Sequence, residues 1–594
     1  LGNTQQAPHI AISILSRGLM AALVTRAYFE GDPLNRADPL LGSIEDAAQR
    51  ATLIAVPAGA GVWRLAVAHF VNGSWAVFDP DGRFDASDLD AVQGLHWVMP
   101  DDPFRPLSPE IFMRDYYEPK LLARVLAGEK FKPVRSLTEL NRVQPAIKIA
   151  KVEPQPDRPD EVSVTIEIAG RTGTFGRADG PILLPSGAFD LHLFRDGQLV
   201  GRNPTEDGEL RLDPKTGRAT IAFEHIRLPR RAGQKEVEFS AYAFNADRVK
   251  SDTHRLKHQL PANFTPRKGT AYVVCVGVNA FDDPKWDLKF AAPDARVMAA
   301  SLREMLAKSE QYERVVVVPL VSDARRDDGK RVFTENTATK ENLQGVLAVL
   351  AGKKPDERLL KAVPSAADLA AARPEDLVLM TFSTHGHNGT DGRFYLIPSD
   401  IGAGHDGKVT DELLRRSIST DNLSSWLRGV DAGEMVMVVD ACHSAGSVEQ
   451  DGFKPGPMGS RGLGQLAYDK RMRILAASQA SDVAFEDQRI GHGLLTFALC
   501  QNGLKEGRAD FEPADKRITM GEWLRYGVKR VPELADEIAG GKVGATSIAG
   551  RALRKVNGKQ TVAQLPSLFE FTKGTDGVIL AGSIGQTPRM PLKE

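Results

Sequence analysis

The sequence predicts two kinds of fold in one chain. Its second half is predicted to be a mostly parallel α/β sheet flanked by helices, and the part before it β-rich, with an immunoglobulin-like sandwich. From Thr270 onward, apolar strands alternate with amphipathic helical segments, as in parallel α/β sheets. Residues 145–262 instead contain short segments in which apolar and polar residues alternate. The length of 594 residues is enough for several domains.

Composition limits the classes of function. The chain is 42% hydrophobic and 26% charged, with a net charge of −1, so no overall field favours nucleic acid or a membrane surface. Its three cysteines, Cys275, Cys442 and Cys500, are too few for a disulfide framework and lack metal-ligand spacing, which favours the cytoplasm. No apolar run is long enough for a membrane span. Because the chain starts at Leu1, a cleaved secretion signal stays an open alternative.

Residues 1–140 are predicted to be mixed or β-rich. Val71–Phe84 has the pattern of two strands around a turn at Asp81-Gly82, and Glu118–Gly128 that of a short helix. In the predicted sandwich, 145–262, a hairpin turn is expected at Asp196-Gly197. Two strands are expected from alternating apolar residues: Val162, Val164, Ile166 and Ile168, then Val237, Phe239, Ala241 and Ala243.

The second half, after a linker at Leu260–Gly269, is predicted to alternate strands and helices. Thr339 suits a helix N-cap, and Thr519 with Glu522 forms a capping box. The strands are expected at Ala271–Val278, Arg314–Val321, Asp376–Ser383, Glu434–Asp440 and Arg471–Ser478, and the helices at Ala292–Leu306, Thr339–Leu350 and Thr420–Arg428.

Two of these strands run directly into residues that can carry chemistry. Asp376–Ser383 is followed by Thr384-His385-Gly386-His387, and Glu434–Asp440 by Ala441-Cys442-His443-Ser444. Sites in open α/β sheets form at the carboxyl ends of strands, so neighbouring strands would place His385 beside Cys442. A thiolate paired with an imidazole suits acyl transfer, because the imidazole accepts the thiol proton and later protonates the leaving amine.

Two further residues complete the predicted site. Gly386 has no side chain, so its N–H can approach a substrate and form an oxyanion hole with the N–H of Cys442. Asp440 lies two residues before Cys442 on the same strand face, roughly 6–7 Å away, and would favour Arg or Lys before the scissile bond. The alternative for Asp440 is a structural cap of the strand end. Cys275 and Cys500 are expected to be buried small hydrophobes.

The two segments THGH and DACHSAG resemble the His and Cys motifs of caspase-like proteases, especially the metacaspase and orthocaspase branch. The similarity extends to YVVCVGVN, LKFAAPDA, RILAASQASDVAFE and GHGLLT, from about Thr270 to about Gly582. It implies a caspase-like peptidase domain at 268–582 and a tail at 583–594. It also implies His385 as base, Cys442 as nucleophile, and Asp440 with Asp294 in the S1 pocket, which holds the residue before the scissile bond. Ser478 would pair with bound peptide.

The sequence departs from the family pattern at two positions: Thr384 replaces the usual Gly before the His, and Ala445 replaces the usual Gly after CHS. Both departures put the local loop geometry in doubt. In the N-terminal half, the segments WAVFDPDGRFD and FSAYAFNADRVKS loosely resemble segments of large bacterial caspase-like proteins, and this resemblance implies a bacterial origin.

A long Gly-rich segment, Glu449–Lys470, follows the predicted catalytic strand. It is either a flexible surface loop or a processing site, with candidate cleavages after Lys454, Arg461, Lys470 and Arg471. No resident cofactor or metal is expected, although Ca²⁺ activation, through carboxylates around the charged loop Asp323–Arg331, is an alternative.

The function predicted from these residues is a cysteine endopeptidase that cleaves proteins or peptides after Arg, then Lys, and is made as a self-processing zymogen. Its N-terminal modules would bind a protein partner. The alternative is a caspase-like binding or signalling scaffold with weak or no peptidase activity.

Overall fold

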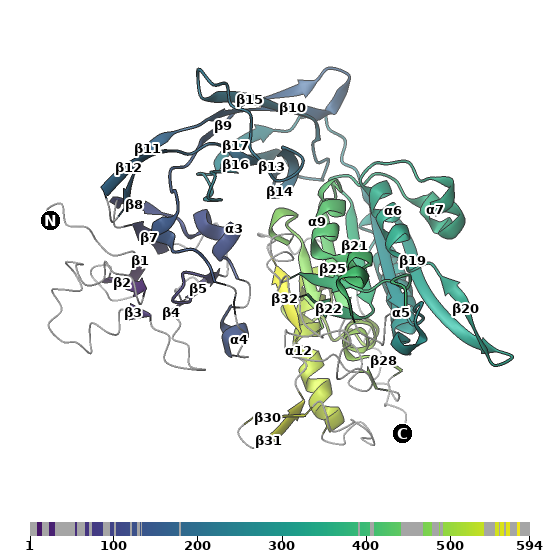
Figure 1. Ribbon diagram of the computed structural model, residues 1–594. Helices are drawn as coiled ribbons and strands as arrows, with labels where there is room; N and C mark the ends of the chain where they lie inside the picture. Colours follow the sequence, from purple (N-terminus) through teal and green to yellow (C-terminus); the bar gives the residue numbers. More distant parts are fainter. Residues whose placement is uncertain are drawn as a thin grey trace. The chain divides into compact units, whose positions relative to one another are not determined.

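The computed structural model forms two compact units, the first comprising Leu1–Ile226 and Glu236–Gln259 and the second Arg227–Lys235 and Leu260–Glu594 (Figure 1). The described residues are 9–14, 23–29, 54–55, 66–69, 74–86, 95–99, 102–118, 121–126, 131, 133–177, 180–389, 393–403, 409–440, 467–477, 486–487, 491–539, 553–556, 559–562, 566–570 and 579–581.

The N-terminal region of the first unit is built from two small sheets and short helices. The predicted turn at Asp81-Gly82 is confirmed, because β5 and β6 pair antiparallel around it and Gly82 adopts a φ of +86°. The five-stranded sheet is ordered β3 (Ile54–Ala55), β2 (Leu23–Phe29), β1 (His9–Ile14), β7 (Leu95–Met99) and β8 (Asp102–Leu107). The other elements are β4 (Ala66–His69), β5 (Trp75–Phe78), β6 (Phe84–Ala86), α3 (Met113–Tyr116) and α4 (Leu121–Leu126).

The rest of the first unit is a module of antiparallel strands. The predicted alternating strands fall in β10 and β16, where all eight of the apolar residues named above are buried. Asp196-Gly197 forms the expected β13–β14 hairpin. The sheets are β15 (Arg218–Arg227), β10 (Arg158–Ala169) and β9 (Ala146–Gln155); β14 (Gln198–Asn203), β13 (Phe189–Arg195), β16 (Glu236–Phe244) and β17 (His254–Gln259); and the pair β11 (Thr172–Arg177) and β12 (Gly180–Pro185). This arrangement is β-rich, and its assignment as an immunoglobulin-like sandwich stays a prediction.

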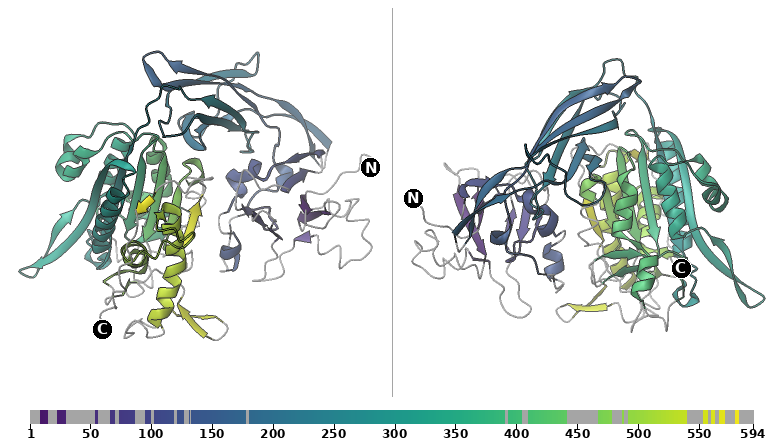
Figure 2. Two further views of the ribbon diagram at one scale, coloured as in Figure 1. Left: turned by 180° about the vertical axis from the view of Figure 1, so that it is seen from behind. Right: turned by 45° about the horizontal axis from the view of Figure 1, so that its top comes forward.

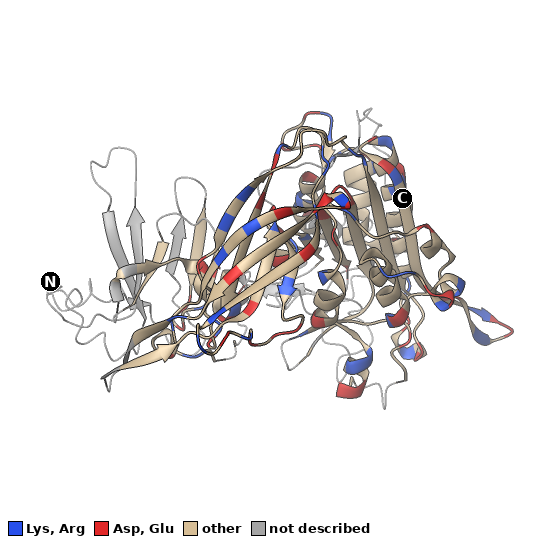
Figure 3. Ribbon diagram, turned by 90° about the horizontal axis from the view of Figure 1, so that it is seen from above, with Lys and Arg blue, Asp and Glu red and all other residues tan. Residues whose placement is uncertain are grey.

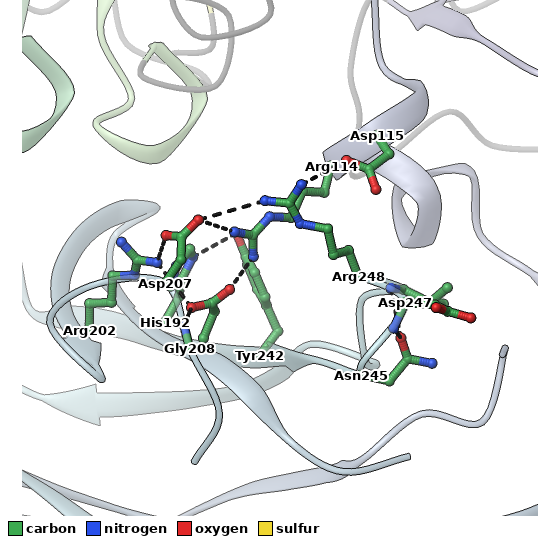
Figure 4. Close-up of polar contacts among 12 residues, drawn as sticks. Arg114, Asp115, His192, Arg202, Asp207, Gly208, Tyr242, Asn245, Asp247 and Arg248 are labelled. Carbon is green, nitrogen blue, oxygen red and sulfur yellow. Dashed lines mark hydrogen bonds and ion pairs between the residues drawn. The ribbon is translucent and has the colours of Figure 1, made fainter. Parts of the chain in front are cut away.

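A charged network joins the N-terminal region to this module (Figure 4). Arg114 of α3 pairs with Asp190 and, at 2.7 Å, with Asp207, while Arg202 of β14 contacts both of these carboxylates. Although burial opposes ionisation, the surrounding arginines lower the pKa of Asp207. The two parts of the first unit are therefore held together by several ion pairs at one point.

The second unit is organised around a seven-stranded sheet between helical layers (Figures 1 and 2). Residues of β18 alternate between two cores. Tyr272, Val274 and Val276 pack on one face with α6 (Lys340–Leu350), α7 (Glu357–Ala362) and α9 (Thr420–Arg428). Ala271, Val273 and Cys275 pack on the other face with α5 (Ala291–Lys308), α11 (Leu494–Thr496) and α12 (Met520–Ala539). The sheet order is β20 (Lys330–Asn336), β19 (Tyr312–Asp327), β18 (Gly269–Val278), β21 (Leu377–Ser383), β25 (Glu434–Asp440), β26 (Arg473–Ala476) and β32 (Ser567–Glu570).

The helices largely match the sequence expectation. Thr339 caps α6 by accepting the N–H of Asn342, and Thr519 with Glu522 forms the expected reciprocal cap before α12. The helices of this unit are α5 (Ala291–Lys308), α6 (Lys340–Leu350), α7 (Glu357–Ala362), α8 (Asp411–Arg416), α9 (Thr420–Arg428), α11 (Leu494–Thr496), the π-helix Phe497–Lys505 and α12 (Met520–Ala539). The short strands are β22 (Gly386–Asn388), β23 (Phe394–Leu396), β24 (Ile418–Ser419), β27 (Glu486–Asp487), β28 (His492–Gly493), β29 (Ile518–Thr519), β30 (Leu553–Val556), β31 (Lys559–Val562) and β33 (Ile579–Ala581).

One expected loop is a hairpin instead. The charged segment Asp323–Arg331 belongs to β19 and β20, which pair antiparallel at the edge of the sheet around a turn at Asp328-Gly329. Both turn residues have positive φ, of 47° and 76°, as two-residue hairpin turns require. Figure 2 shows this hairpin extending from the sheet edge, and Figure 3 shows that it carries both signs of charge. The charge pattern here therefore marks an exposed edge strand.

A loop of the β-rich module belongs to the second unit. Residues Arg227–Lys235 connect β15 to β16 and contact the segment that precedes β21. Arg227 and Arg231 donate to the carbonyl oxygens of Ala372 (2.8 Å) and Pro374 (2.7 Å). The loop is thus bonded at the amino ends of the central strands, opposite the edge that bears the predicted site.

Candidate active site

The two strands that lead to the predicted catalytic residues are neighbours. β21 and β25 pair in parallel, and their last residues, Ser383 and Asp440, are directly opposite each other. The next N–H, of Thr384, donates to the carbonyl of Asp440 at 3.3 Å. The predicted adjacency of the two strands is confirmed, and their carboxyl ends meet at one edge. Cys442 lies two residues beyond β25, outside the described residues.

His385 is held in a buried position at this edge. Its side chain is 3% exposed, and its Nε2 lies 2.8 Å from the backbone oxygen of Trp286. The ring is tilted against Phe281, with centroids 5.2 Å apart. Because a carbonyl can only accept, Nε2 must carry the proton in this contact. In the neutral ring, Nδ1 is then the nitrogen that can take a proton from a nucleophile.

The loop that carries His385 is fixed by two hydrogen bonds to the backbone of Ile397. The carbonyl of His385 accepts the N–H of Ile397 at 3.0 Å, and the Thr384 hydroxyl donates to the Ile397 carbonyl at 2.6 Å. Thr384 is 1% exposed and is not among the residues with positive φ. Thr384, which stands where the family has Gly, therefore adds a hydrogen bond to Ile397 and requires no strained backbone. Gly386 starts β22 and pairs with Leu396 of β23, and its oxyanion role stays a prediction.

Asp294 lies in the first turn of α5, and β18 fixes that turn. The side-chain oxygen of Asn279, just after β18, accepts the N–H of Ala292 at 3.0 Å. Gly277 of β18 allows close packing here, because a Cβ at this position would be 2.5 Å from the carbonyl oxygen of Ala291. The helix start and its carboxylate are thereby pressed against the sheet.

Asp294 and Asp440 both approach Gly493 closely with one carboxylate oxygen. A Cβ added to Gly493 would be 2.7 Å from Oδ2 of Asp440 and 3.1 Å from Oδ2 of Asp294. Both aspartates are buried, at 1% exposed for Asp294 and 4% for Asp440. The Ser383 hydroxyl reaches Oδ2 of Asp294 at 3.5 Å. The structure thus brings together the two carboxylates that the resemblance implied for one pocket.

Two of the contacts of Asp294 come from a distant part of the chain. Its Oδ1 lies 2.8 Å from Nδ1 of His492, and its Oδ2 accepts the N–H of Gly493 at 3.1 Å. His492 and Gly493 make up β28, which pairs with β27. Sequence reasoning missed both residues, although the GHG triplet before an apolar helix was a signal that backbone approaches closely there.

The other two cysteines are buried away from any nucleophilic role. Cys275 is in β18, and Cys500 lies in the π-helix with its sulfur 3.5 Å from that of Met298. Both side chains are at most 1% exposed, and burial raises the pKa of each thiol to about 12. Neither can supply a thiolate near neutral pH, which agrees with their expected role as small hydrophobes.

The candidate processing residues divide into two groups. Lys454 and Arg461 lie outside the described residues, as does Ser478. Lys470 is described and is 2% exposed, and its ammonium donates to the carbonyls of Arg428 (2.7 Å) and Val430 (3.1 Å) at the end of α9. Since a protease must accommodate the side chain in its pocket, Lys470 is not available for cleavage in this conformation. Arg471 follows with a φ of +48° and an intermediate exposure.

The alternative of a Ca²⁺ site at the β19–β20 hairpin stays a prediction, and two of the carboxylates there pair with arginines. Asp323 pairs with Arg296 at 3.2 Å, and Asp327 with Arg325 at 3.6 Å. Within the described ranges, no group of three or more His, Cys, Asp or Glu could hold a metal ion.

Comparison with known proteins shows which family the second half of the chain resembles. Among the helices of the described residues, none is long and apolar enough to cross a membrane. The chain is similar to a solved structure from Bacillus anthracis, described as a polysaccharide deacetylase, at 8% identity over 54% of this chain and 78% of the other. The TM-score of 0.13 is too low to carry an argument. Residues 270–517 match the family model described as the caspase domain. This segment includes His385, Cys442, Asp294 and Asp440 in its sequence, and residues 270–517 are therefore identified as a caspase domain, the domain of the caspase-like cysteine peptidases.

Proposed function

We propose that the chain is a cysteine endopeptidase that cleaves after Arg and, less well, after Lys. The observation that carries this specificity is the convergence of Asp440 and Asp294 beside Gly493, at the edge where His385 lies. Two buried carboxylates that face one space repel each other unless a cation or a proton is shared between them. A guanidinium can bond to both at once, whereas an ammonium is a single point charge.

The proposed reaction proceeds through an acyl-enzyme. Nδ1 of His385 takes the proton of Cys442, and the thiolate attacks the carbonyl carbon after the basic residue. The oxyanion accepts hydrogen bonds from the N–H groups of Gly386 and Cys442. As the C–N bond breaks, the imidazolium gives its proton to the leaving amine. Water, deprotonated by the same imidazole, then hydrolyses the thioester.

Trp286 supports the cationic stage of this cycle. When His385 holds two protons, the Nε2–H remains directed at the Trp286 carbonyl, 2.8 Å away. An oxygen with partial negative charge stabilises the imidazolium and keeps the ring from turning. The Trp286 carbonyl therefore orients the imidazole, as a carboxylate does in a catalytic triad.

The enzyme is further proposed to be made as a zymogen that processes itself. Lys454 and Arg461 are the preferred cleavage sites, since the Lys470 side chain is buried, and Arg471 is a third candidate. Mass spectrometry of the purified chain tests this, because Cys442→Ala should remain whole.

Further proposals concern the N-terminal modules, the origin and location of the protein, and its activation. The β-rich module is proposed to be immunoglobulin-like and, with the N-terminal region, to bind a protein partner. The bacterial origin and the cytoplasmic location are proposed from the resemblance and from the cysteine content. Calcium activation remains an alternative, for which addition of Ca²⁺ to the peptide assay is the direct test.

The specificity is tested with short peptide amides that end in Arg, Lys or Asp. We expect Cys442-dependent release in the order Arg, Lys, Asp, with Asp440→Asn lowering kcat/KM for Arg about 100-fold or more. A preference for Asp over Arg would refute the carboxylate argument. The alternative of a binding scaffold would be favoured if no peptide were cleaved by the intact or by the processed chain.

A further inference from the structure

We infer that His492 is a positioning residue for substrate selection, which holds Asp294 in the orientation that favours arginine over lysine. This inference rests on the proposed specificity. His492 does not belong to either catalytic strand; it lies on β28, after the second catalytic strand in sequence. It nevertheless contacts Asp294, with 2.8 Å between Nδ1 and Oδ1.

The two oxygens of Asp294 have different partners. Oδ1 lies against the His492 ring, while Oδ2 receives the Gly493 N–H and lies in the space that Oδ2 of Asp440 also faces. The His492 ring, together with the Gly493 N–H, therefore fixes the rotation of the carboxylate about its last bond. A carboxylate without this contact could turn and present its oxygens at other angles.

Gly493 has no side chain that could fill the gap between the two carboxylates. A Cβ there would be 2.7 Å from Asp440 and 3.1 Å from Asp294, closer than carbon and oxygen approach without displacement. Gly493 therefore keeps the space between the carboxylates open while its backbone helps to hold one of them. His492 and Gly493 act together as a third wall of the pocket, supplied by a segment remote in sequence from both aspartates.

The orientation of the Asp294 carboxylate should matter more for an Arg substrate than for a Lys substrate. A guanidinium binds through a rigid planar fork and is sensitive to the angle of its acceptors, whereas an ammonium tolerates many angles. Loss of the His492 contact should therefore weaken Arg substrates more than Lys substrates. A purely structural contact would instead lower stability and affect both substrates equally.

Three substitutions of His492, made in the 594-residue chain, distinguish a positioning role from a purely structural one. The amide of Asn can donate from the position of Nδ1, whereas the amide of Gln reaches that of Nε2. We expect His492→Ala and His492→Gln to lower kcat/KM for an Arg peptide amide about tenfold, mostly through KM, and that for a Lys peptide less than threefold. His492→Asn should restore at least half of the Arg/Lys ratio, and thermal unfolding shows whether each variant is folded.

The outcomes distinguish this inference from the function on which it rests. If the parent enzyme cleaves after Arg but the Arg/Lys ratio of folded His492→Ala stays within twofold of the parent, the positioning role is overturned and the specificity stands. Equal losses for Arg and Lys with unchanged KM would also overturn it. If the parent shows no Cys442-dependent cleavage after Arg, the proposed function and this inference both fail.

Discussion

The Nε2 atom of His385 lies 2.8 Å from the backbone oxygen of Trp286, although 99 positions separate the two residues in the chain. This contact decides which ring nitrogen carries the proton. In the neutral ring Nδ1 is then the nitrogen that can accept a proton, so the proposed base needs no third side chain to set its tautomer. The imidazole also packs against Phe281, so its orientation depends on the segment between β18 and α5 as much as on its own strand.

The packing of Phe281 against His385 predicts an effect on turnover. Phe281→Leu keeps most of the volume but removes the flat ring that limits rotation of the imidazole. We expect kcat to fall about fivefold to tenfold, with KM within twofold, because Phe281 is fully buried against the imidazole. Steady-state kinetics with an Arg peptide amide measure this change. A folded variant with unchanged kcat would show that the Trp286 carbonyl alone suffices to orient the ring.

Thiol burial predicts which cysteine reacts. Because the pKa of Cys275 and of Cys500 is raised to about 12 by burial, neither should react with iodoacetamide in the folded chain at pH 7.5. Alkylation followed by peptide mass mapping should find label on Cys442 alone. The control is alkylation in 6 M guanidinium chloride, in which all three cysteines should be labelled. Label on Cys275 in the native chain would contradict its burial.

The strand ends could be predicted from sequence because parallel buried strands leave a strong local signature. His385 and Asp440 each follow a run of apolar residues, and the position of such runs fixes where the polar residues emerge. The contacts of Trp286 and His492 could not be predicted in this way. Each joins segments about 100 or more residues apart, and tertiary packing, not local pattern, sets such pairs.

The β19–β20 hairpin was missed for a different reason. Its tip is exposed and charged, so it lacks the apolar alternation of a half-buried strand. The Asp-Gly pair at 328–329 was a usable signal, as it was at Asp81-Gly82 and at Asp196-Gly197, where apolar residues flank the turn. An edge strand under no burial constraint can be recognised from its turn more readily than from its body.

The close approach at Gly433 predicts a loss of stability. A Cβ there would be 1.9 Å from a guanidinium nitrogen of Arg231 and 1.9 Å from the Pro374 carbonyl oxygen, so backbone must move. We expect Gly433→Ala to lower the free energy of unfolding by about 1–3 kcal/mol. It should also expose the Arg227–Lys235 loop to trypsin.

A matched control for this substitution is Gly345→Ala in the middle of α6. There the new methyl group would meet only the end of the Leu359 side chain, at 3.1 Å, which can adjust. Its stability should stay within about 1 kcal/mol of the parent, since Ala also favours helix. Urea unfolding and timed trypsin digestion of both variants give the comparison. Equal behaviour would show that the loop is not held at Gly433.

Asp376 predicts a pH dependence of stability. Burial raises the pKa of Asp376 to about 6. The N–H of Thr270, which donates to the carboxylate at 2.7 Å, opposes this shift because it favours the ionised form. The folded state therefore holds this proton more tightly than the unfolded state, whose value is near 3.8. The resulting stabilisation is complete below pH 3.8 and is lost as the pH rises through 6. From pH 4.5 to 7.5 the loss should be about 2 kcal/mol.

The Asp376→Asn variant isolates this contribution. An amide resembles the protonated acid, so the variant should lack the pH-dependent loss, although one of the two N–H bonds from Thr270 and Arg373 would be weakened at every pH. The relevant quantity is the difference in unfolding free energy between parent and variant, followed by urea titration at several pH values. It should move in favour of the variant by about 2 kcal/mol between pH 4.5 and 7.5. A constant difference across this range would mean that Asp376 is ionised throughout, with its charge stabilised by the backbone N–H groups at the start of β18 and before β21.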